Sequence, residues 1–169
     1  MSVLIDCAEG VSPLLTEEEV RSICAHVLAA EGVDRPVEVS LSWVDDEEML
    51  SLNAEWRGID KVTDVLSFEC DAPTTEDLPA GEPVELGDII LAPVQIARQA
   101  PGFGNDPADE CRLMFVHGLL HLLGYDHIED EEAEVMEARE DELLRELAVQ
   151  RGADPAAVAV GPTTRHEHD

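Results

Sequence analysis

The sequence is poor in basic and aromatic residues, and it lacks any long apolar run. Lysine and arginine number 10 against 39 aspartates and glutamates, which gives a formal net charge of −29 at pH 7. Such a surface repels phosphates, so general affinity for nucleic acid, DNA included, is not expected. The absence of a run of about 18 apolar residues argues against a membrane span. The charge instead indicates a solubilising polyanionic surface, a basic partner or a medium of high ionic strength.

Cysteine is also scarce, and the N-terminal residues lack the features of a secretory signal. The four cysteines (Cys7, Cys24, Cys70 and Cys111) are widely spaced and form no CxxC pair. In a chain of this kind we expect reduced, partly buried thiols rather than disulfides. Residues 1–10 contain neither a basic run nor an apolar core of signal-peptide length. These absences predict a cytoplasmic protein.

The hydrophobic pattern predicts helices and strands along most of the chain. Capping residues and helical periodicity predict helices over residues 16–32, 45–56, 107–123 and 129–148, with another starting at Pro93. Strand patterns cover residues 37–43, 62–68 and 86–92, and residues 71–85 are expected to form a loop. This order predicts one compact α+β domain over residues 1–150, in which helices pack on a small mixed sheet. Residues 151–169 lack periodicity and are expected to form a disordered tail.

Three of the six histidines lie in the segment HGLLHLLGYDH, residues 117–127. His117 and His121 are one helical turn apart, so their imidazoles share a face and can hold one metal ion. Gly124 tolerates positive φ, so the helix can end there and the chain can fold back to bring in His127. Three nitrogen ligands with an open fourth position are typical of a catalytic zinc site. Histidines satisfied by hydrogen bonds would explain one or two of these residues, whereas the full pattern predicts one zinc ion per chain in a hydrolase.

The histidine spacing matches that of the metzincin peptidases, in which a glutamate after the first histidine is the general base. Gly118 occupies that position here and cannot accept a proton, so a peptidase would lack its base. The small residue predicts room for a bulky nucleotide beside the metal. Asp126 is expected either to orient a histidine or to serve only as a group at the helix end.

The same segment resembles the signature of the YbeY family of bacterial endoribonucleases. Residues 57–68 (RGIDKVTDVLSF) resemble the family's arginine-to-TDVLSF block, residues 86–90 its LGDI strand, and Met136 with residues 140–144 its closing helix. The resemblance implies a compact α+β fold with a zincin-like metal helix and zinc at His117, His121 and His127. It also implies single-strand-specific cleavage of ribosomal RNA, in 16S rRNA 3′ end maturation and ribosome quality control.

The resemblance further implies a catalytic, substrate-side role for Arg57. Its guanidinium can clamp the phosphodiester oxygens on which negative charge develops. Taken alone, an arginine beside a short helix is more typical of a solvated surface charge, and the resemblance reverses that preference. Thr63, Asp64 and Ser67 are expected either to line the same cleft or to make loop hydrogen bonds and caps.

Two other functions stay open at the level of sequence. A metallopeptidase or other zinc hydrolase with a substrate of low charge would suit the acidic surface better than an RNA enzyme does. A non-catalytic ribosome-assembly factor would use its acids to dock a basic ribosomal protein. For the endoribonuclease we expect segregated charge: Arg57, Lys61, Arg98 and Arg112 surround the metal, and the acids of residues 129–148, Glu140 included, face solvent or a basic ribosomal protein.

Overall fold

A mixed sheet forms the centre of the molecule. The computed structural model describes residues 1–72, 81–126 and 129–158. The 4-stranded sheet has the order β1-β2-β4-β3, with β1 at Ser2–Cys7, β2 at Val37–Trp43, β3 at Val65–Glu69 and β4 at Val84–Leu91. β1, β2 and β4 run parallel, whereas β3 is an edge strand that pairs antiparallel with β4.

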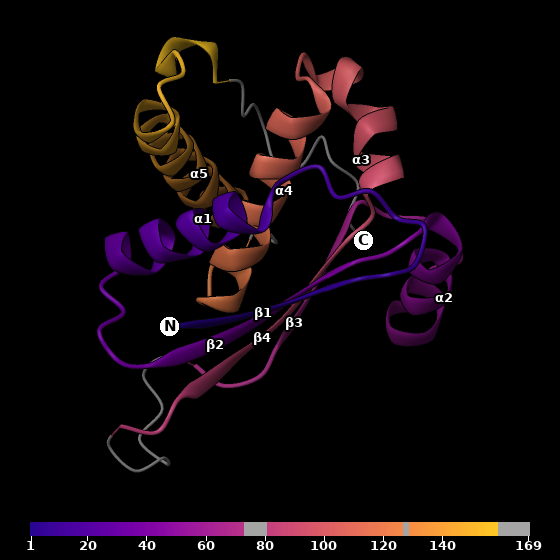
Figure 1. Ribbon diagram of the computed structural model, residues 1–169, viewed down its shortest axis with the longest axis horizontal. Coiled ribbons are helices and arrows are strands. Elements are labelled where there is room, and N and C mark those ends of the chain that lie inside the picture. Colours follow the sequence, from indigo (N-terminus) through magenta and orange to yellow (C-terminus); the bar gives the residue numbers. More distant parts are fainter. Residues whose placement is uncertain (73–80, 127–128, 159–169) are drawn as a thin grey trace.

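Helices cover one face of the sheet fully and the other only at one end. The helices of the described residues are α1 (Glu17–Ala30), α2 (Asp46–Arg57), α3 (Pro93–Gln99), α4 (Pro107–Leu122) and α5 (Asp130–Gln150), with short 3-10 helices η1 (Ala100–Phe103) and η2 (Pro155–Ala157). Figure 1 shows α1, α4 and α5 together above the sheet and α2 at its far end. Leu41, Ile89 and Phe115 belong to the main core between the sheet and the upper helices. Met49 of α2 packs with Leu66 of β3 in a second, smaller cluster.

Local signals placed most of these elements correctly. The Thr16 side chain accepts a hydrogen bond from the Glu19 amide at 3.1 Å, and Asp45 accepts one from the Glu48 amide at 2.8 Å. Both side chains are N-caps of predicted helices. The sheet and the helices packed on it confirm the predicted α+β class. The prediction missed β1, in which only Val3 is buried, and it began β3 too early. None of the described helices has the length and apolar character needed to cross a membrane.

The segment after α5 continues the fold. Residues 155–157 form η2, the Arg145 guanidinium donates to the Pro155 carbonyl at 2.9 Å, and Val158 packs against the core. Residues 151–158 therefore belong to the folded part, which corrects the predicted start of the tail at residue 151. Residues 159–169 lie outside the described residues.

The cysteines are free, as predicted, and two of them are core residues. Cys24 and Cys111 are buried, whereas Cys7 and Cys70 are exposed. Burial raises the pKa of the Cys24 thiol to about 12, and burial also raises the pKa of the Cys111 thiol. These two side chains therefore act as small apolar residues at neutral pH.

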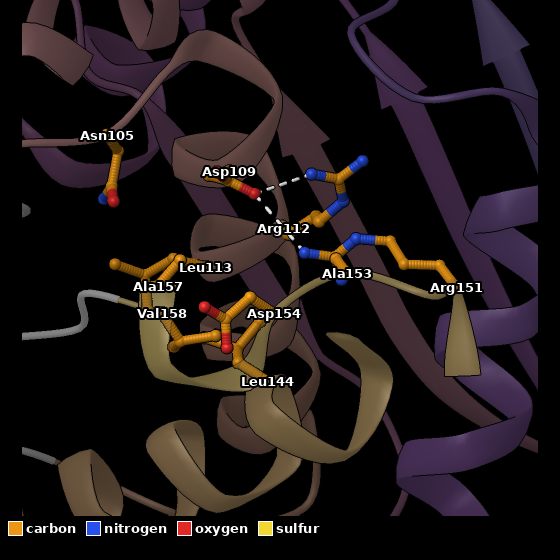
Figure 2. A pocket seen from close by; sticks show the side chains of 10 residues that line it. All are labelled: Asn105, Asp109, Arg112, Leu113, Leu144, Arg151, Ala153, Asp154, Ala157 and Val158. Carbon is orange, nitrogen blue, oxygen red and sulfur yellow. Dashed lines mark hydrogen bonds and ion pairs between the residues drawn. The ribbon is translucent and has the colours of Figure 1, made fainter. Parts of the chain in front are cut away.

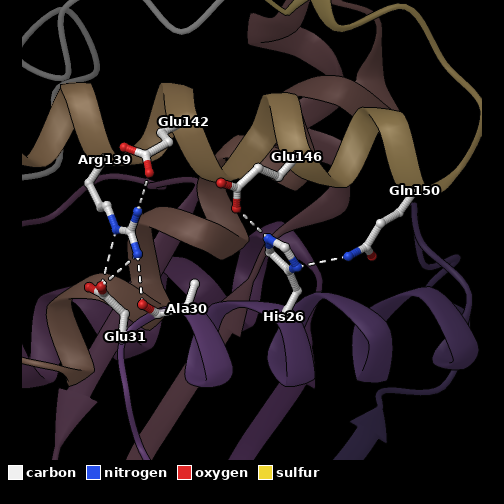
Figure 3. Close-up of polar contacts among 7 residues, drawn as sticks. All are labelled: His26, Ala30, Glu31, Arg139, Glu142, Glu146 and Gln150. Atoms are coloured by element: carbon white, nitrogen blue, oxygen red, sulfur yellow. Dashed lines mark hydrogen bonds and ion pairs between the residues drawn. The ribbon is translucent and has the colours of Figure 1, made fainter.

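Polar contacts fix α5 against α1 (Figure 3). The Arg139 guanidinium donates to the Ala30 carbonyl at 3.0 Å and pairs with Glu31 at 3.0 Å. About two helical turns further along α5, His26 of α1 lies between Glu146, at 2.7 Å, and Gln150, at 2.8 Å. These contacts determine where the inward-facing side chains of α5 lie.

Candidate metal centre

The helix that carries the histidine motif packs directly on the sheet. α4 begins at the N-cap Asp106, which accepts a hydrogen bond from the Asp109 amide at 2.8 Å, and His117 is 2% exposed. A Cβ atom on Gly118 would lie 3.1 Å from Ser67 Oγ and 3.2 Å from Ile89 Cγ2. Gly118 thus faces β3 and β4 rather than open space. The predicted room for a nucleotide at this position is wrong, because the missing side chain lets the helix approach the sheet.

The C-terminal end of α4 folds back in the way the sequence predicts. Gly124 has φ 104°, and its amide donates to the His121 carbonyl at 3.0 Å. The Tyr125 amide donates to the Leu120 carbonyl at 3.0 Å, which completes a Schellman motif. This turn brings the Tyr125 carbonyl to 3.0 Å from His121 Nδ1. A carbonyl only accepts, so Nδ1 of His121 carries the proton and Nε2 carries the lone pair.

His117 is oriented by a buried carboxylate on another helix. Its Nδ1 lies 2.9 Å from Glu140 Oε1, and the two side chains are 2% and 1% exposed. With Nδ1 donating to the carboxylate, Nε2 of His117 also carries a lone pair. A carboxylate that accepts from the second nitrogen of a metal-binding histidine fixes its tautomer and raises its basicity.

The two Nε2 atoms lie close together. His117 Nε2 and His121 Nε2 are 3.0 Å apart, and the ring centroids are separated by 4.5 Å at an interplanar angle of 84°. Two facing lone pairs repel unless a proton or a metal ion lies between them. In a tetrahedral zinc site with Zn–N bonds of about 2.0–2.1 Å, neighbouring nitrogens are about 3.3 Å apart. The pair is therefore within a few tenths of an ångström of the separation that two zinc ligands require.

The third predicted ligand, His127, lies outside the described residues, as does residue 128. Within the part of the chain that the structure covers, no group of three or more histidine, cysteine or acidic side chains is placed to hold a metal. The structure thus brings His117 and His121 together, and His127 stays a prediction. The orienting groups seen here are Glu140 and the Tyr125 carbonyl, while that role for Asp126 also stays a prediction.

Glu140 was not identified from the sequence as the partner of His117, because it lies in a run of acids. It was expected to face solvent with the rest of the helix, which is wrong: Glu140 is fully buried, whereas Glu131, Glu134 and Glu142 are exposed. The sequence did contain a signal. Glu140 is spaced at helical intervals from the apolar residues Met136, Leu143 and Leu144, so it occupies the buried face of α5.

Arg57 lies on the other side of edge strand β3 from the histidines. It is an exposed residue in the last turn of α2. Its neighbour Trp56 packs edge-on against Phe68 of β3, with ring centroids 6.0 Å apart. The preceding residue of β3, Ser67, faces α4 beside Gly118. Arg57 and the pair of His117 and His121 are therefore carried by elements that pack on opposite faces of one strand.

The polar residues before β3 have mainly structural contacts. Asp64 is 3% exposed and accepts hydrogen bonds from the Val65 amide and from Gln99 Nε2, both at 2.7 Å. Gln99 also donates to the buried Glu110 at 2.9 Å. Thr63 is buried beside Asp64. These contacts tie the start of β3 to α3 and α4, and they favour the structural interpretation over a cleft-lining role for Thr63 and Asp64.

Two of the four basic residues expected around the metal are neutralised elsewhere. Arg98 pairs with Asp46 at 2.9 Å, and Arg112 pairs with Glu19 at 2.5 Å. Figure 2 shows the guanidinium groups of Arg112 and Arg151 both directed at Asp109, in a cavity between α4 and the segment after α5 that none of the predicted site residues lines. The other two basic residues, Arg57 and Lys61, are both exposed.

The chain is similar to proteins of one family. The family model described as "Endoribonuclease YbeY" matches residues 8–148. A curated protein of that name from Exiguobacterium sibiricum is 38% identical to this chain, over 82% of this chain and 92% of its own length. Another, from Rhodospirillum rubrum, is 42% identical over 90% of this chain and 76% of its own length. A third, from Paramagnetospirillum magneticum, is 42% identical over 88% of this chain and 96% of its own. The solution structure of TM1509 from Thermotoga maritima is similar with a TM-score of 0.62 and 28% identity, covering 89% of this chain and 91% of that one.

Proposed function

The chain belongs to the YbeY family of endoribonucleases, and from this premise we propose that it is a zinc-dependent enzyme that cleaves single-stranded ribosomal RNA. One observation carries the zinc: the Nε2 atoms of His117 and His121 face each other at 3.0 Å, while both Nδ1 atoms are held by acceptors. The donor set fits a borderline cation that prefers nitrogen.

In this proposal His117, His121 and His127 hold one zinc ion per chain. Zinc in such a site supplies Lewis-acid chemistry, because it acidifies a water molecule and polarises a phosphoryl oxygen. Glu140 and the Tyr125 carbonyl keep the imidazole protons on Nδ1, so both rings stay in the ligating tautomer. Arg57 acts on the substrate, where its planar guanidinium binds the phosphodiester oxygens. Gly118 provides no base, since glycine has no side chain to accept a proton.

The cellular role follows from the family and from the charge. We place the enzyme in the cytoplasm, in 16S rRNA 3′ end maturation and ribosome quality control, with residues 1–150 as the catalytic domain. A net charge of −29 predicts weak binding to naked RNA. Delivery to the substrate therefore depends on the ribosome, through contacts between the acidic face of α5 and a basic ribosomal protein. That face includes the exposed Glu131, Glu134 and Glu142.

The test is RNA cleavage by zinc-loaded and zinc-stripped protein, on single-stranded RNA, duplex RNA and casein. Single-stranded RNA should be cut only by the loaded protein, and added zinc should restore the stripped one. The double variant with His117→Ala and His121→Ala, purified in parallel to control for contaminating nucleases, should be inactive. His26→Ala removes a histidine of α1 that lies outside the site and should stay active.

The other outcomes identify the rival functions. Casein cleavage by the unmodified protein would make it a peptidase. A loaded, folded protein that binds ribosomal subunits and cuts no RNA, either free or on the subunits, would be an assembly factor.

A further inference from the structure

The most exposed large apolar side chain of the described residues is next to Arg57. Trp56 is 64% exposed, whereas the chain's other tryptophan, Trp43, is buried at 1%. An indole normally lies partly in the core or finds a partner, because its large apolar area is unfavourable in water. Exposure of this ring, on an element beside the candidate site, therefore requires an explanation.

The ring is exposed and also fixed in place. Phe68 supports it edge-on, at 6.0 Å between centroids and 65° between planes. The helix ends immediately afterwards at Gly58, which has φ 71° and donates to the Ala54 carbonyl at 3.1 Å. Since the backbone beside the ring is helical and Phe68 contacts the ring, a ligand that stacks on the indole has less conformational entropy to remove than it would on an unsupported side chain.

Exposed cations and acids alternate around the ring, where Arg57 and Lys61 lie near Glu55 and Asp60. The buried Asn53 donates from Nδ2 to the Lys61 carbonyl at 2.9 Å, which folds the loop after α2 back onto the helix. Arg57 and Lys61 are therefore carried on the same end of α2 as Trp56, and both are exposed. An exposed aromatic ring flanked by cations is the combination with which proteins bind single-stranded nucleic acid: bases stack on the ring and phosphates contact the cations.

The position of the ring also suits a substrate of the metal centre. Phe68, which supports Trp56, and Ser67, which faces Gly118 beside His117, are consecutive residues of β3. β3 is an edge strand, so no further strand separates the two faces there. An extended RNA strand that crosses this edge can contact the end of α2 and the end of α4 together.

We propose that Trp56 is the stacking platform for an unpaired base of the RNA substrate, with Arg57 and Lys61 binding the adjacent phosphates. This inference rests on the proposed function and adds the source of its single-strand preference. A base in a duplex is already paired and stacked, so it cannot lie on the indole without the loss of those interactions.

The experiment uses zinc-loaded protein and a 2′-O-methyl oligonucleotide with phosphorothioate linkages, whose intact length is checked after each titration. Trp56 should supply the quenchable fluorescence, because the buried Trp43 is shielded. Single-stranded oligonucleotide should quench the emission and the matching duplex should not. Trp56→Ala should weaken binding about tenfold or more, and Trp56→Phe should keep most of the affinity. Val149→Ala removes another exposed apolar side chain, on α5, and should bind as the wild type does.

The outcomes separate this inference from the proposed function. If the wild type cleaves single-stranded RNA but Trp56→Ala binds and cleaves it normally, the stacking role is overturned and the proposed function stands. If the wild type neither binds nor cleaves RNA, both fail. If Trp56→Ala loses affinity for ribosomal subunits but not for the oligonucleotide, the ring is a protein-docking site and the inference is wrong.

Discussion

Substituting Glu140 with glutamine removes one charge from the metal centre while keeping its shape. His117 Nδ1 donates to Glu140 Oε1 over 2.9 Å in a site where the two side chains are 2% and 1% exposed. A glutamine Oε1 can accept the same hydrogen bond. As a neutral acceptor, however, it holds the Nδ1 proton more weakly and leaves Nε2 a poorer ligand. The variant therefore tests whether Glu140 tunes the metal ligand or only fills space.

The expected loss of zinc affinity is large enough to measure. Removal of a partner that orients a ligating histidine lowers metal affinity about 10- to 100-fold, or about 1.4–2.7 kcal/mol. We expect a value toward the upper end, because the pair is fully buried and its electrostatic interaction is not screened by water. Glu134→Gln removes the same charge from the exposed face of α5 and should leave the affinity within about twofold.

The assay is competition for zinc against a chromogenic chelator at neutral pH, with circular dichroism and thermal unfolding of each metal-free protein. Both variants should remain folded, and only Glu140→Gln should release zinc at lower chelator concentration. Equal zinc affinity for the wild type and a folded Glu140→Gln would show that the carboxylate contributes nothing to the ligand.

Three further predictions concern other parts of the chain. Gly118→Glu should lower the free energy of unfolding by more than about 3 kcal/mol in urea titrations, because its side chain would enter the contact with Ser67, and it should not create casein cleavage. Arg57→Ala should keep zinc and thermal stability while RNA cleavage falls about 100-fold or more, Arg57→Lys should recover part of the rate, and an unchanged rate would leave Arg57 a surface charge. Burial raises the pKa of the Cys24 thiol to about 12 and also raises the pKa of the Cys111 thiol. In the unfolded chain both thiols have their ordinary, lower pKa, so they ionise at a lower pH there than in the folded protein. The free energy of unfolding should therefore fall as pH rises above about 9, by about 1.4 kcal/mol per pH unit for each buried thiol, and Cys24→Val should reduce that slope.

Helix boundaries and the histidine pair could be predicted because their causes are local. A capping side chain such as Thr16 satisfies an amide of its own helix, and the spacing of His117 and His121 alone places them on one face. The turn at Gly124 is local as well, since it depends on one positive φ. None of these features requires knowledge of which surface the helix packs against.

The features that could not be predicted depend on contacts between distant segments. Glu140 has the sequence environment of a solvated acid, and only the docking of α5 on α4 makes it the partner of His117. The packing of Gly118 on the sheet likewise could not be predicted, because it depends on how α4 docks on β3 and β4. Strand β1 has too few buried residues to show an alternating pattern, and it is recognised only by its pairing with β2.

The distribution of charge was only partly predictable for the same reason. Arg98 and Arg112 are near the site in the sequence, but each finds a carboxylate on another element, Asp46 of α2 and Glu19 of α1. The contacts that remain for RNA near the edge strand are few. Binding to naked RNA should therefore be weak and only shallowly dependent on salt.

X-ray absorption at the zinc edge of the loaded protein measures the ligands of the metal ion. We expect one zinc ion per chain, with three imidazole nitrogens and one oxygen at about 2.0–2.1 Å, and one imidazole fewer in His127→Ala. A spectrum with sulfur at about 2.3 Å, or with no imidazole scattering, would contradict a centre built from His117, His121 and His127.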